Sequence, residues 1–468
     1  PYAVRLSPDG ASVLVSNRLT NPVHFREPPM AELTVVDVPS RRVADRRVLR
    51  GAHLLESVDF TPDGRLALTT LTRPKQLVPS TQVERGWMLT YGLGILEMTG
   101  DGRSVQVLLD DVNAYFADPY DLLIAPDGQR AYVTHAAANT VTVIDLAALE
   151  NLVEGATPDS IALYRNHLGL SSRYVVARIP TGANPKRLAL SPDGRHLYVA
   201  ERLEDGIAVI DTEHLEKVRT IDLDGPSDVN TLRLGERMFH GARAFQRQFS
   251  CRSCHPDGDQ DALAWDFAEP LGLGRNIVNT MTLRDIGATG PFKWAGTNVS
   301  LYMQDGIRFA KHLTRVDPFP PRELNALVAY MYSIPQPPNR YRDPADDWSA
   351  AELRGKAIFE RTVTTDGAPI PPEGRCITCH PEPYYTIRQK FDVGTLRPTD
   401  KEMPFDTPQL VNIYDTAPYL HDGGAATLEE IWTKNSLNDE HGVVSDLTKT
   451  HLNDLVQYLR ALGPPEDD

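Results

Sequence analysis

Two short stretches, Cys251-Arg252-Ser253-Cys254-His255 and Cys376-Ile377-Thr378-Cys379-His380, share one pattern of two cysteines, two spacer residues and a histidine. Together they contain all four cysteines of the 468-residue chain. The pattern predicts haem c attachment, because two thiols at this spacing add to the vinyl groups of one porphyrin and the adjacent histidine reaches the iron. A zinc site or disulfides would also use cysteine pairs, but neither gives a reason for a histidine after each pair. We therefore expect two covalently bound haem c groups, with His255 and His380 as proximal iron ligands.

The segments around the two motifs are an internal duplication. Residues 234–239 precede the first motif as residues 354–359 precede the second, and residues 280–296 align with residues 407–423 without a gap. Each copy then closes with a run in which Leu, Leu, Val and Tyr recur at helical spacing, over residues 324–330 and 452–458. We predict two tandem all-α cytochrome c domains, over residues 227–340 and 341–468, joined by a proline-rich linker.

The N-terminal half is punctuated by tight turns that contain Pro-Asp-Gly. Apolar runs of strand length lie beside the turns. The turns start at Pro8, Pro62, Pro126 and Pro192, and the runs include residues 12–16, 33–37, 130–134, 140–145, 196–200 and 206–211. This pattern resembles the YVTN-type repeat and predicts an N-terminal all-β propeller over residues 1–226, with four or five blades.

The intervals between these turns exceed the roughly 40–45 residues of common blade repeats. We expect insertions over residues 70–90 and 149–175 to account for the excess. Either the propeller is small, or upstream blades are missing from the chain, or a strand from elsewhere closes it. The first residues already read as the inside of a folded domain, so we expect the chain to have been processed or its start to be missing.

Charge and hydropathy narrow the possible partners. The chain has 63 acidic and 48 basic residues, for a net charge of -15. This balance argues against nucleic acid and against an anionic membrane surface, because both bind clustered Lys and Arg. No apolar run reaches the roughly 18 residues of a membrane-spanning helix, so no transmembrane segment is expected. Since haem c is normally attached outside the cytoplasm, we expect a periplasmic or otherwise exported protein.

The C-terminal half resembles the bacterial di-haem cytochrome c peroxidase and MauG superfamily over about residues 228–464. The resemblance rests on residues 234–255 and 407–430, which include His421-Asp422-Gly423. It implies a catalytic haem with an accessible iron face at His255, an electron-relay haem at His380, and a Ca²⁺ ion between the haem domains. A propeller joined to such a unit is also similar in architecture to the α subunit of hydrazine synthase.

The position of the second axial ligand of the relay haem differs from that family, whose members usually have a Met at this position. The aligned position is Asn435 in this chain. His441 is the first candidate downstream, and His421 is the second. Imidazole in place of Met would lower the reduction potential of the relay haem.

Candidate catalytic residues follow the segment Trp294-Ala295-Gly296, in which Ala295 replaces the Asp of the family. A peroxidase needs a group there that moves a proton. The candidates are Gln304, Asp305 and Arg308. His312 is a candidate sixth iron ligand, which would turn this haem into a second relay.

Aromatic and histidine side chains offer further hypotheses. Trp294 stands where the family carries an aromatic residue between the haems, although a buried packing role is an equal alternative. His24 and His135, in the N-terminal half, could point toward a haem, but a lone histidine in such a position is usually structural.

Three functions stay open. The first is a di-haem oxidoreductase of the peroxidase and MauG type, with a small-molecule oxidant or substrate and a redox partner protein. The second is a non-catalytic electron-transfer subunit of a larger redox complex. The third is a haem enzyme that acts on a small nitrogen compound, as in hydrazine synthase.

Overall fold

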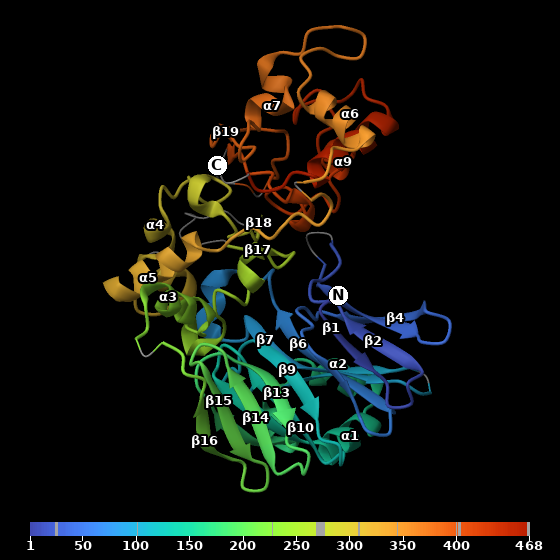
Figure 1. Cartoon of the computed structure of the whole chain (residues 1–468), viewed down its shortest axis with the longest axis vertical. Helices are drawn as coiled ribbons and strands as arrows, with labels where there is room; N and C mark the ends of the chain where they lie inside the picture. The colour runs from blue at the N-terminus through green and yellow to red at the C-terminus, as the bar shows by residue number, and fades with distance from the viewer. Residues whose placement is uncertain are drawn as a thin grey trace.

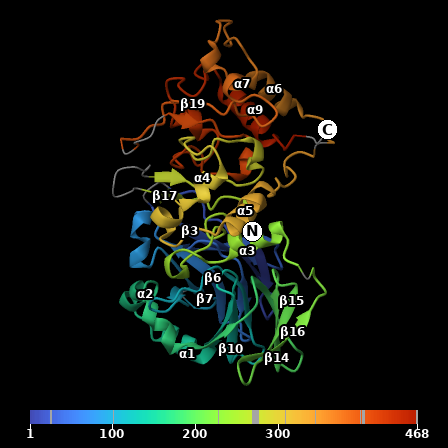
Figure 2. The same ribbon diagram turned by 90° about the vertical axis from the view of Figure 1, so that its left-hand side faces the viewer.

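The computed structural model describes residues 1–465, apart from residues 24–26, 101, 227, 268–276, 308, 344, 399 and 401–403 and the side chains of Thr81 and His312. Figures 1 and 2 show β-sheets at one end of the molecule and the C-terminal segment at the other. We call residues 1–226 the sheet half, residues 228–340 the first unit and residues 341–465 the second unit. The first unit lies between the other two parts (Figure 1).

Four four-stranded antiparallel sheets form the sheet half, and the strands of each sheet pair in sequence order. The edge strands β1, β5, β9 and β13 lie beside one another in that order, which makes the arrangement propeller-like. The strands are β1 (Ala3–Leu6), β2 (Ser12–Ser16), β3 (Met30–Asp37), β4 (Arg42–Arg50), β5 (Val58–Phe60), β6 (Leu66–Pro74), β7 (Leu89–Glu97), β8 (Ser104–Leu108), β9 (Pro119–Ile124), β10 (Arg130–His135), β11 (Thr140–Asp145), β12 (Val175–Pro180), β13 (Pro185–Leu190), β14 (His196–Glu201), β15 (Gly206–Asp211) and β16 (Glu216–Asp222).

The predicted Pro-Asp-Gly turns are confirmed, and each joins the edge strand of a sheet to the next strand. In the first turn the amide of Gly10 donates to the carbonyl of Ser7 at 2.9 Å, and Gly10 has a φ of 70°. Glycine adopts this left-handed conformation without the steric cost that a side chain would bring. The same bond recurs at Gly64, Gly128 and Gly194.

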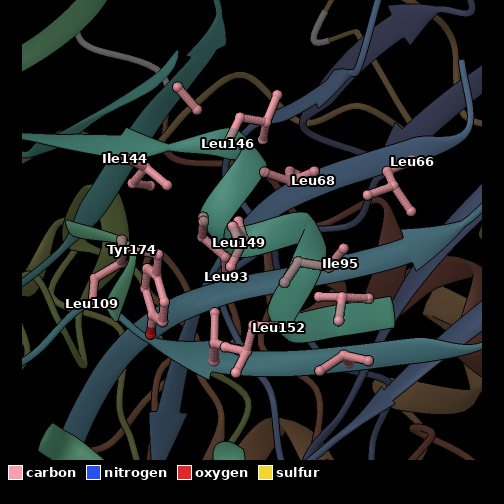
Figure 3. Close-up of a cluster of buried hydrophobic side chains, with 14 of the residues drawn as sticks. Leu66, Leu68, Leu93, Ile95, Leu109, Ile144, Leu146, Leu149, Leu152 and Tyr174 are labelled. Atoms are coloured by element: carbon pink, nitrogen blue, oxygen red, sulfur yellow. The ribbon is translucent and has the colours of Figure 1, made fainter. Parts of the chain in front are cut away.

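The sheet half is not all-β, contrary to the prediction. Helices α1 (Leu146–Glu154) and α2 (Pro158–Tyr164) and the 3-10 helix η2 (Leu168–Arg173) lie between β11 and β12. Asp145 caps α1 by accepting a hydrogen bond from the amide of Ala148 at 2.9 Å. The apolar side of α1 packs on β6 and β7, where Leu149 and Leu152 meet Leu93 (Figure 3). A segment that we expected only as an insertion therefore contributes an amphipathic helix to the core.

Two pairs of helices repeat between the first and second units. α3 packs on α5 and α6 packs on α9, and α5 and α9 contain the two predicted closing helices. Glycine permits each crossing, because an added Cβ would lie 1.9 Å from the carbonyl oxygen of Ala326 at Gly235 and 2.1 Å from that of Asp454 at Gly355. The α-helices of these units are α3 (Thr231–His240), α4 (Leu301–Asp305), α5 (Pro321–Tyr332), α6 (Ala350–Phe359), α7 (Cys376–Cys379), α8 (Glu430–Thr433) and α9 (Lys449–Arg460).

The prediction of two all-α cytochrome c domains is wrong. The first unit contains a two-stranded sheet of β17 (Ala264–Asp266) and β18 (Ile277–Asn279), and the second unit contains one of β19 (Lys390–Phe391) and β20 (Phe405–Asp406). The long stretches between the helices are largely irregular, since proline and glycine interrupt them too often for a helix to propagate. Among the residues that the structure describes, no helix is both long and apolar enough to cross a membrane.

The remaining helical elements are short. They are the 3-10 helices η1 (Ser80–Arg85) in the sheet half and η3 (Phe245–Arg247), η4 (Pro256–Gly258), η5 (Ile286–Ala288), η7 (Pro372–Gly374) and η8 (Ile413–Asp415), together with the π-helical segment η6 (Phe309–Thr314).

Candidate haem-binding cavity

Both Cys-x-x-Cys-His segments open onto one cavity of about 900 Å³. This volume lies at the upper end of the roughly 300–1,000 Å³ of typical small-molecule pockets. All four cysteines and both motif histidines line it, although the two motifs lie in different units. Most other lining side chains are apolar or aromatic, including Phe239, Leu283, Phe359, Leu428 and Trp432. The cavity therefore offers apolar walls with a few polar groups, as a porphyrin site requires.

The sheet half also contributes to this cavity. Ser80 and Val83 of η1, followed by Met88 and Leu89, are among its lining residues. The first three of these residues belong to the long connection between β6 and β7, and Leu89 begins β7. Within this connection, η1 packs against the π-helical segment η6 of the first unit. The insertion predicted over residues 70–90 thus forms part of the cavity wall and extends strands β6 and β7.

Each motif histidine is oriented by a backbone carbonyl. His255 Nδ1 donates to the carbonyl of Asp259 at 3.1 Å, and His380 Nδ1 donates to the carbonyl of Tyr385 at 2.8 Å. Burial lowers the pKa of both imidazoles to about 4, so both are neutral near pH 7. A neutral imidazole with Nδ1 held by a carbonyl presents Nε2 to a metal. These two histidines therefore fit the role of haem iron ligands.

Among the residues that the structure describes, the four cysteines do not cluster as a zinc site requires. All four are free, and burial raises the pKa of Cys251 to about 12 and that of Cys376 to about 11. Within the described ranges, no group of three or more His, Cys, Asp or Glu residues could hold a metal ion. The geometry therefore gives no support to the zinc alternative, and the Ca²⁺ ion stays a prediction from the resemblance.

His441 lies close to the second motif. It lines the cavity, and its pKa is lowered to about 4 by burial and by the neighbouring His380. Its Nδ1 has no hydrogen-bond partner within the described part of the chain. His441 therefore lies on the His380 side of the cavity, and its role as a second ligand stays a prediction.

His421 is held in a different way. Its Nε2 lies 2.8 Å from Asp400 Oδ2, and its ring stacks on Phe405 with the ring centroids 3.9 Å apart. It lines the cavity, but the carboxylate occupies the nitrogen that a haem iron would need. The Met-equivalent position, Asn435, instead accepts a hydrogen bond from Arg397 at 2.9 Å.

The predicted catalytic residues Gln304 and Asp305 both line the cavity. Gln304 Oε1 accepts a hydrogen bond from Asn298. Burial raises the pKa of Asp305 to about 7, and its Oδ2 has no partner among the residues described. Asp305 also raises the pKa of Cys251, which places it on the side of the first motif. Arg308 lies outside the described residues, as does the side chain of His312.

Trp294 lies where the first and second units meet. Its indole Nε1 donates to the carbonyl of Asn279 at 2.8 Å, and its own carbonyl accepts a hydrogen bond from the amide of Asp406 at 2.7 Å. The side chain is half-buried and lines the cavity. This position suits both the packing role and the electron-path role predicted for Trp294.

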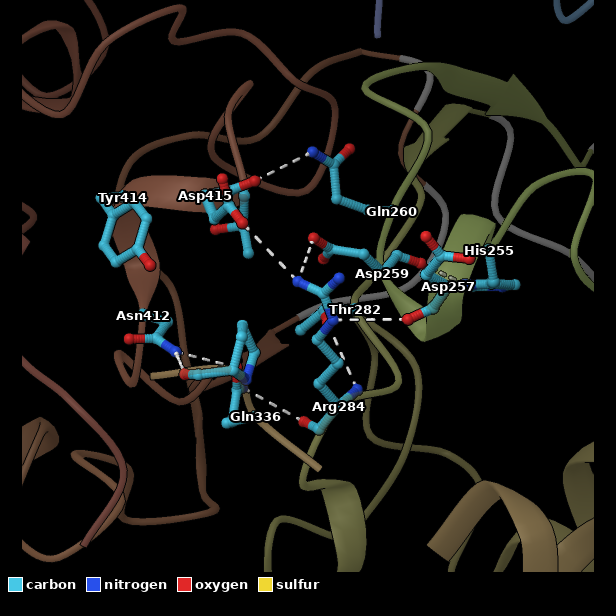
Figure 4. A network of polar contacts seen from close by, with 12 residues as sticks. His255, Asp257, Asp259, Gln260, Thr282, Arg284, Gln336, Asn412, Tyr414 and Asp415 are labelled. Atoms are coloured by element: carbon cyan, nitrogen blue, oxygen red, sulfur yellow. Dashed lines mark hydrogen bonds and ion pairs between the residues drawn. The ribbon is translucent and has the colours of Figure 1, made fainter. Parts of the chain in front are cut away.

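A polar network joins the two units behind His255 (Figure 4). Arg284 Nη1 lies 2.6 Å from Asp259 Oδ2 and 3.6 Å from Asp415 Oδ2. Burial raises the pKa of Asp259 to about 6, although Arg284 acts in the opposite direction. Gln260 Nε2 donates to the carbonyl of Ala417 at 2.9 Å. The carbonyl that holds His255 thus belongs to a residue tied to the second unit, a link that the sequence pattern did not indicate.

Two histidines of the sheet half, His135 and His24, were candidates to point toward a haem. His135 is buried, with Nδ1 2.6 Å from the carbonyl of Phe116 and Nε2 2.9 Å from Thr142 Oγ1. Both ring nitrogens have partners within the sheet half, so His135 has a structural role. His24 lies outside the described residues.

Comparison with known proteins finds two similar subunits of one enzyme. The chain is 31% identical over 212 residues to hydrazine synthase subunit beta of Kuenenia stuttgartiensis, a match that covers 45% of this chain and 53% of the subunit. It is 29% identical over 290 residues to subunit gamma of the same organism, with 51% of this chain and 79% of the subunit covered. The chain therefore spans about half the length of the first relative. No family model matches the chain.

Two solved structures are also similar to parts of this chain. A structure of Kuenenia stuttgartiensis hydrazine synthase matches 45% of this chain and 58% of its own, with 32% identity and a TM-score of 0.42. A second, of hydrazine synthase pressurized with xenon, matches 51% of this chain and 89% of its own, with 28% identity and a TM-score of 0.44. Since no family model matches, the resemblance to the di-haem peroxidase and MauG superfamily stays a prediction from motifs.

Proposed function

We propose that this chain is a di-haem c oxidoreductase that acts on a small nitrogen compound within a multi-subunit enzyme similar to hydrazine synthase. The observation that carries the proposal is the similarity to two different subunits of that enzyme in a chain with two Cys-x-x-Cys-His segments on one cavity. Each of the two matches covers about half of this chain.

The cavity residues take simple roles in this proposal. Cys251 and Cys254 hold one porphyrin, and Cys376 and Cys379 hold the other. When bound, haem c would supply an iron that exchanges single electrons and can bind a small ligand. His255 and His380 would be the proximal ligands, with Nδ1 of each fixed by a carbonyl. Because this attachment takes place outside the cytoplasm, the proposed location is periplasmic or otherwise exported.

The two sides of the cavity differ, and the difference assigns their roles. On the second side His441 offers a further imidazole, so this side is the electron relay. On the first side Asp305 offers a carboxyl with a pKa of about 7, which can hold or release a proton near neutrality. The apolar walls keep water from competing with a small substrate. The reaction on a nitrogen compound therefore belongs to the first side.

The proposal can be tested by stopped-flow spectroscopy of the purified holoprotein mixed with hydrazine or, separately, with hydrogen peroxide. We expect hydrazine to reduce the ferric haem, and Asp305→Asn to slow that reduction by about 10²-fold or more, because oxidation of hydrazine releases protons that Asp305 would accept. Asp110→Asn, a buried carboxylate of the sheet half outside the cavity, serves as the matched control. Fast turnover of peroxide without any response to hydrazine would support the peroxidase alternative. A protein silent to both compounds would support an electron-transfer subunit.

A further inference from the structure

The two attachment segments share their backbone hydrogen bonds but differ in what their spacer residues contact. In the second segment, which forms the helical turn α7 (Cys376–Cys379), the amide of His380 donates to the carbonyl of Cys376 at 2.9 Å, and the amide of His255 donates to that of Cys251 at the same distance in the first. The spacer Ile377 of the second segment packs into the apolar core of the second unit. The spacers of the first segment, Arg252 and Ser253, are buried polar side chains, so they need partners of their own.

Asp118 of the sheet half supplies one of these contacts. It directly precedes β9, and its two carboxylate oxygens accept from Ser253 Oγ at 2.6 Å and from Ser250 Oγ at 2.7 Å. The two serines also bind each other's backbone, since the amide of Ser250 donates to Ser253 Oγ at 3.0 Å and the amide of Ser253 to Ser250 Oγ at 3.2 Å. Asp118 thus closes a buried ring of hydrogen bonds around Cys251.

Glu56 of the sheet half supplies the second contact. Its carboxylate pairs with the guanidinium of Arg252, the first spacer residue, and both side chains are only 1% exposed. Arg18 Nε lies 3.1 Å from the same carboxylate, and Arg18 Nη1 lies 2.6 Å from Asp257, just after the motif. The sheet half therefore binds the first motif on both sides of its cysteines.

The second motif has no such partner. Within the residues that the structure describes, no hydrogen bond or ion pair joins α7 to the sheet half, and Thr378 makes no side-chain hydrogen bond. The second motif is thus an internal control for the first, in the same chain and on the same cavity.

We propose that Asp118 and Glu56 are positioning residues that hold the first Cys-x-x-Cys-His segment in the conformation that presents both thiols and His255 to one porphyrin. The inference rests on the proposed function, because it assumes haem attachment at both motifs. It assigns the sheet half a specific role in the first haem site and none in the second. A polar spacer pair, Arg-Ser, on the first motif matches this role, while Ile-Thr on the second does not.

The test compares Asp118→Ala, Ser253→Ala and Asp118→Asn in the full chain, with Asp110→Asn as the control. Asp110 is equally buried in the sheet half, but it accepts hydrogen bonds from the amides of Tyr91 and Phe116 and does not contact the motif. Haem is counted on each Cys-x-x-Cys-His peptide by mass spectrometry after proteolysis. The electron paramagnetic resonance (EPR) spectrum and reduction potential of each haem are recorded on the chains that carry both.

We expect Asp118→Ala and Ser253→Ala to lower haem occupancy at the first peptide at least twofold and to leave the second peptide unchanged. Chains that still carry both haems should show a shifted EPR signal and potential for the first haem alone. Asp118→Asn should restore occupancy, because its amide can accept from one serine hydroxyl and donate to the other.

Full occupancy of the first peptide in Asp118→Ala with unchanged signals would overturn the inference, and so would equal loss of haem from both peptides. The absence of haem from both peptides of the unsubstituted chain would instead refute the proposed function. A chain that binds two haems but ignores hydrazine would refute only the proposed chemistry.

Discussion

The buried ion pair between Glu56 and Arg252 makes a sharp prediction about stability. Glu56→Gln keeps the shape of the side chain but removes the anion that faces the Arg252 guanidinium. Both side chains are 1% exposed, so solvent does not screen the lost charge. Breaking a buried pair in this way costs about 3–5 kcal/mol, because it leaves a buried charge without its partner.

The double variant Glu56→Gln/Arg252→Met should cost much less than the two single variants together. An apolar side chain of similar length removes the unpaired charge, and such replacements are often close to neutral. Arg18 also binds Glu56, so part of the cost of Glu56→Gln will persist. We expect a coupling energy of at least about 2 kcal/mol between positions 56 and 252.

Urea unfolding of the holoprotein, followed by far-ultraviolet circular dichroism, gives the four free energies of the cycle. Glu154→Gln is the control, because Glu154 pairs with Arg65 at 3.1 Å while 60% of its side chain is exposed. An exposed pair contributes about 1 kcal/mol or less. Additivity of the two single variants within about 0.5 kcal/mol would refute the claim that the pair joins the sheet half to the first motif.

Three further predictions concern single groups. Burial raises the pKa of Asp110 from 3.8 to about 7, so the folded state keeps a proton that the unfolded chain releases near pH 4. The free energy of unfolding should therefore fall by up to about 4 kcal/mol between pH 4 and 7, and urea unfolding at pH 5 and 8 should show a smaller fall in Asp110→Asn. Gly355→Ala should lower the free energy of unfolding by about 1–3 kcal/mol in thermal unfolding, because its Cβ would meet a carbonyl on α9. Leu353→Ala, at an exposed site of α6, is the control and should change the stability little. A more stable Gly355→Ala would contradict the close packing of α6 on α9. His441→Ala should convert one low-spin haem to high spin in the EPR spectrum, and an unchanged spectrum would exclude His441 as a ligand.

Local patterns in the sequence predicted the local features of the fold. The Pro-Asp-Gly turns and several strands, such as β11 and β15, follow from residue types that act over a few positions. The closing helices α5 and α9 follow from apolar residues at helical spacing. The predicted all-α fold of the two units was wrong, because similarity between motifs does not reveal how much of a cofactor-binding segment is irregular. Apolar residues that face a cofactor need not belong to a helix.

The contacts that build the site could not be predicted in the same way. Asp118 binds Ser253 across 135 residues of sequence, and Glu56 binds Arg252 across 196. No periodic pattern in the sequence links residues so far apart. Nothing in the sequence beside Asp118 or Glu56 distinguishes it from the other carboxylates of the chain. The polar spacers Arg252 and Ser253 were the only signal, since buried polar side chains need partners. The difference between His421 and His441 likewise depends on Asp400, which only the folded chain brings close.

The EPR spectrum of the ferric holoprotein, recorded before and after the addition of hydrazine, tests the central claim most directly. We predict one high-spin and one low-spin haem, with hydrazine changing only the high-spin signal. Two low-spin haems that ignore hydrazine, or a chain without covalent haem, would contradict the proposal of a di-haem site for a small nitrogen compound.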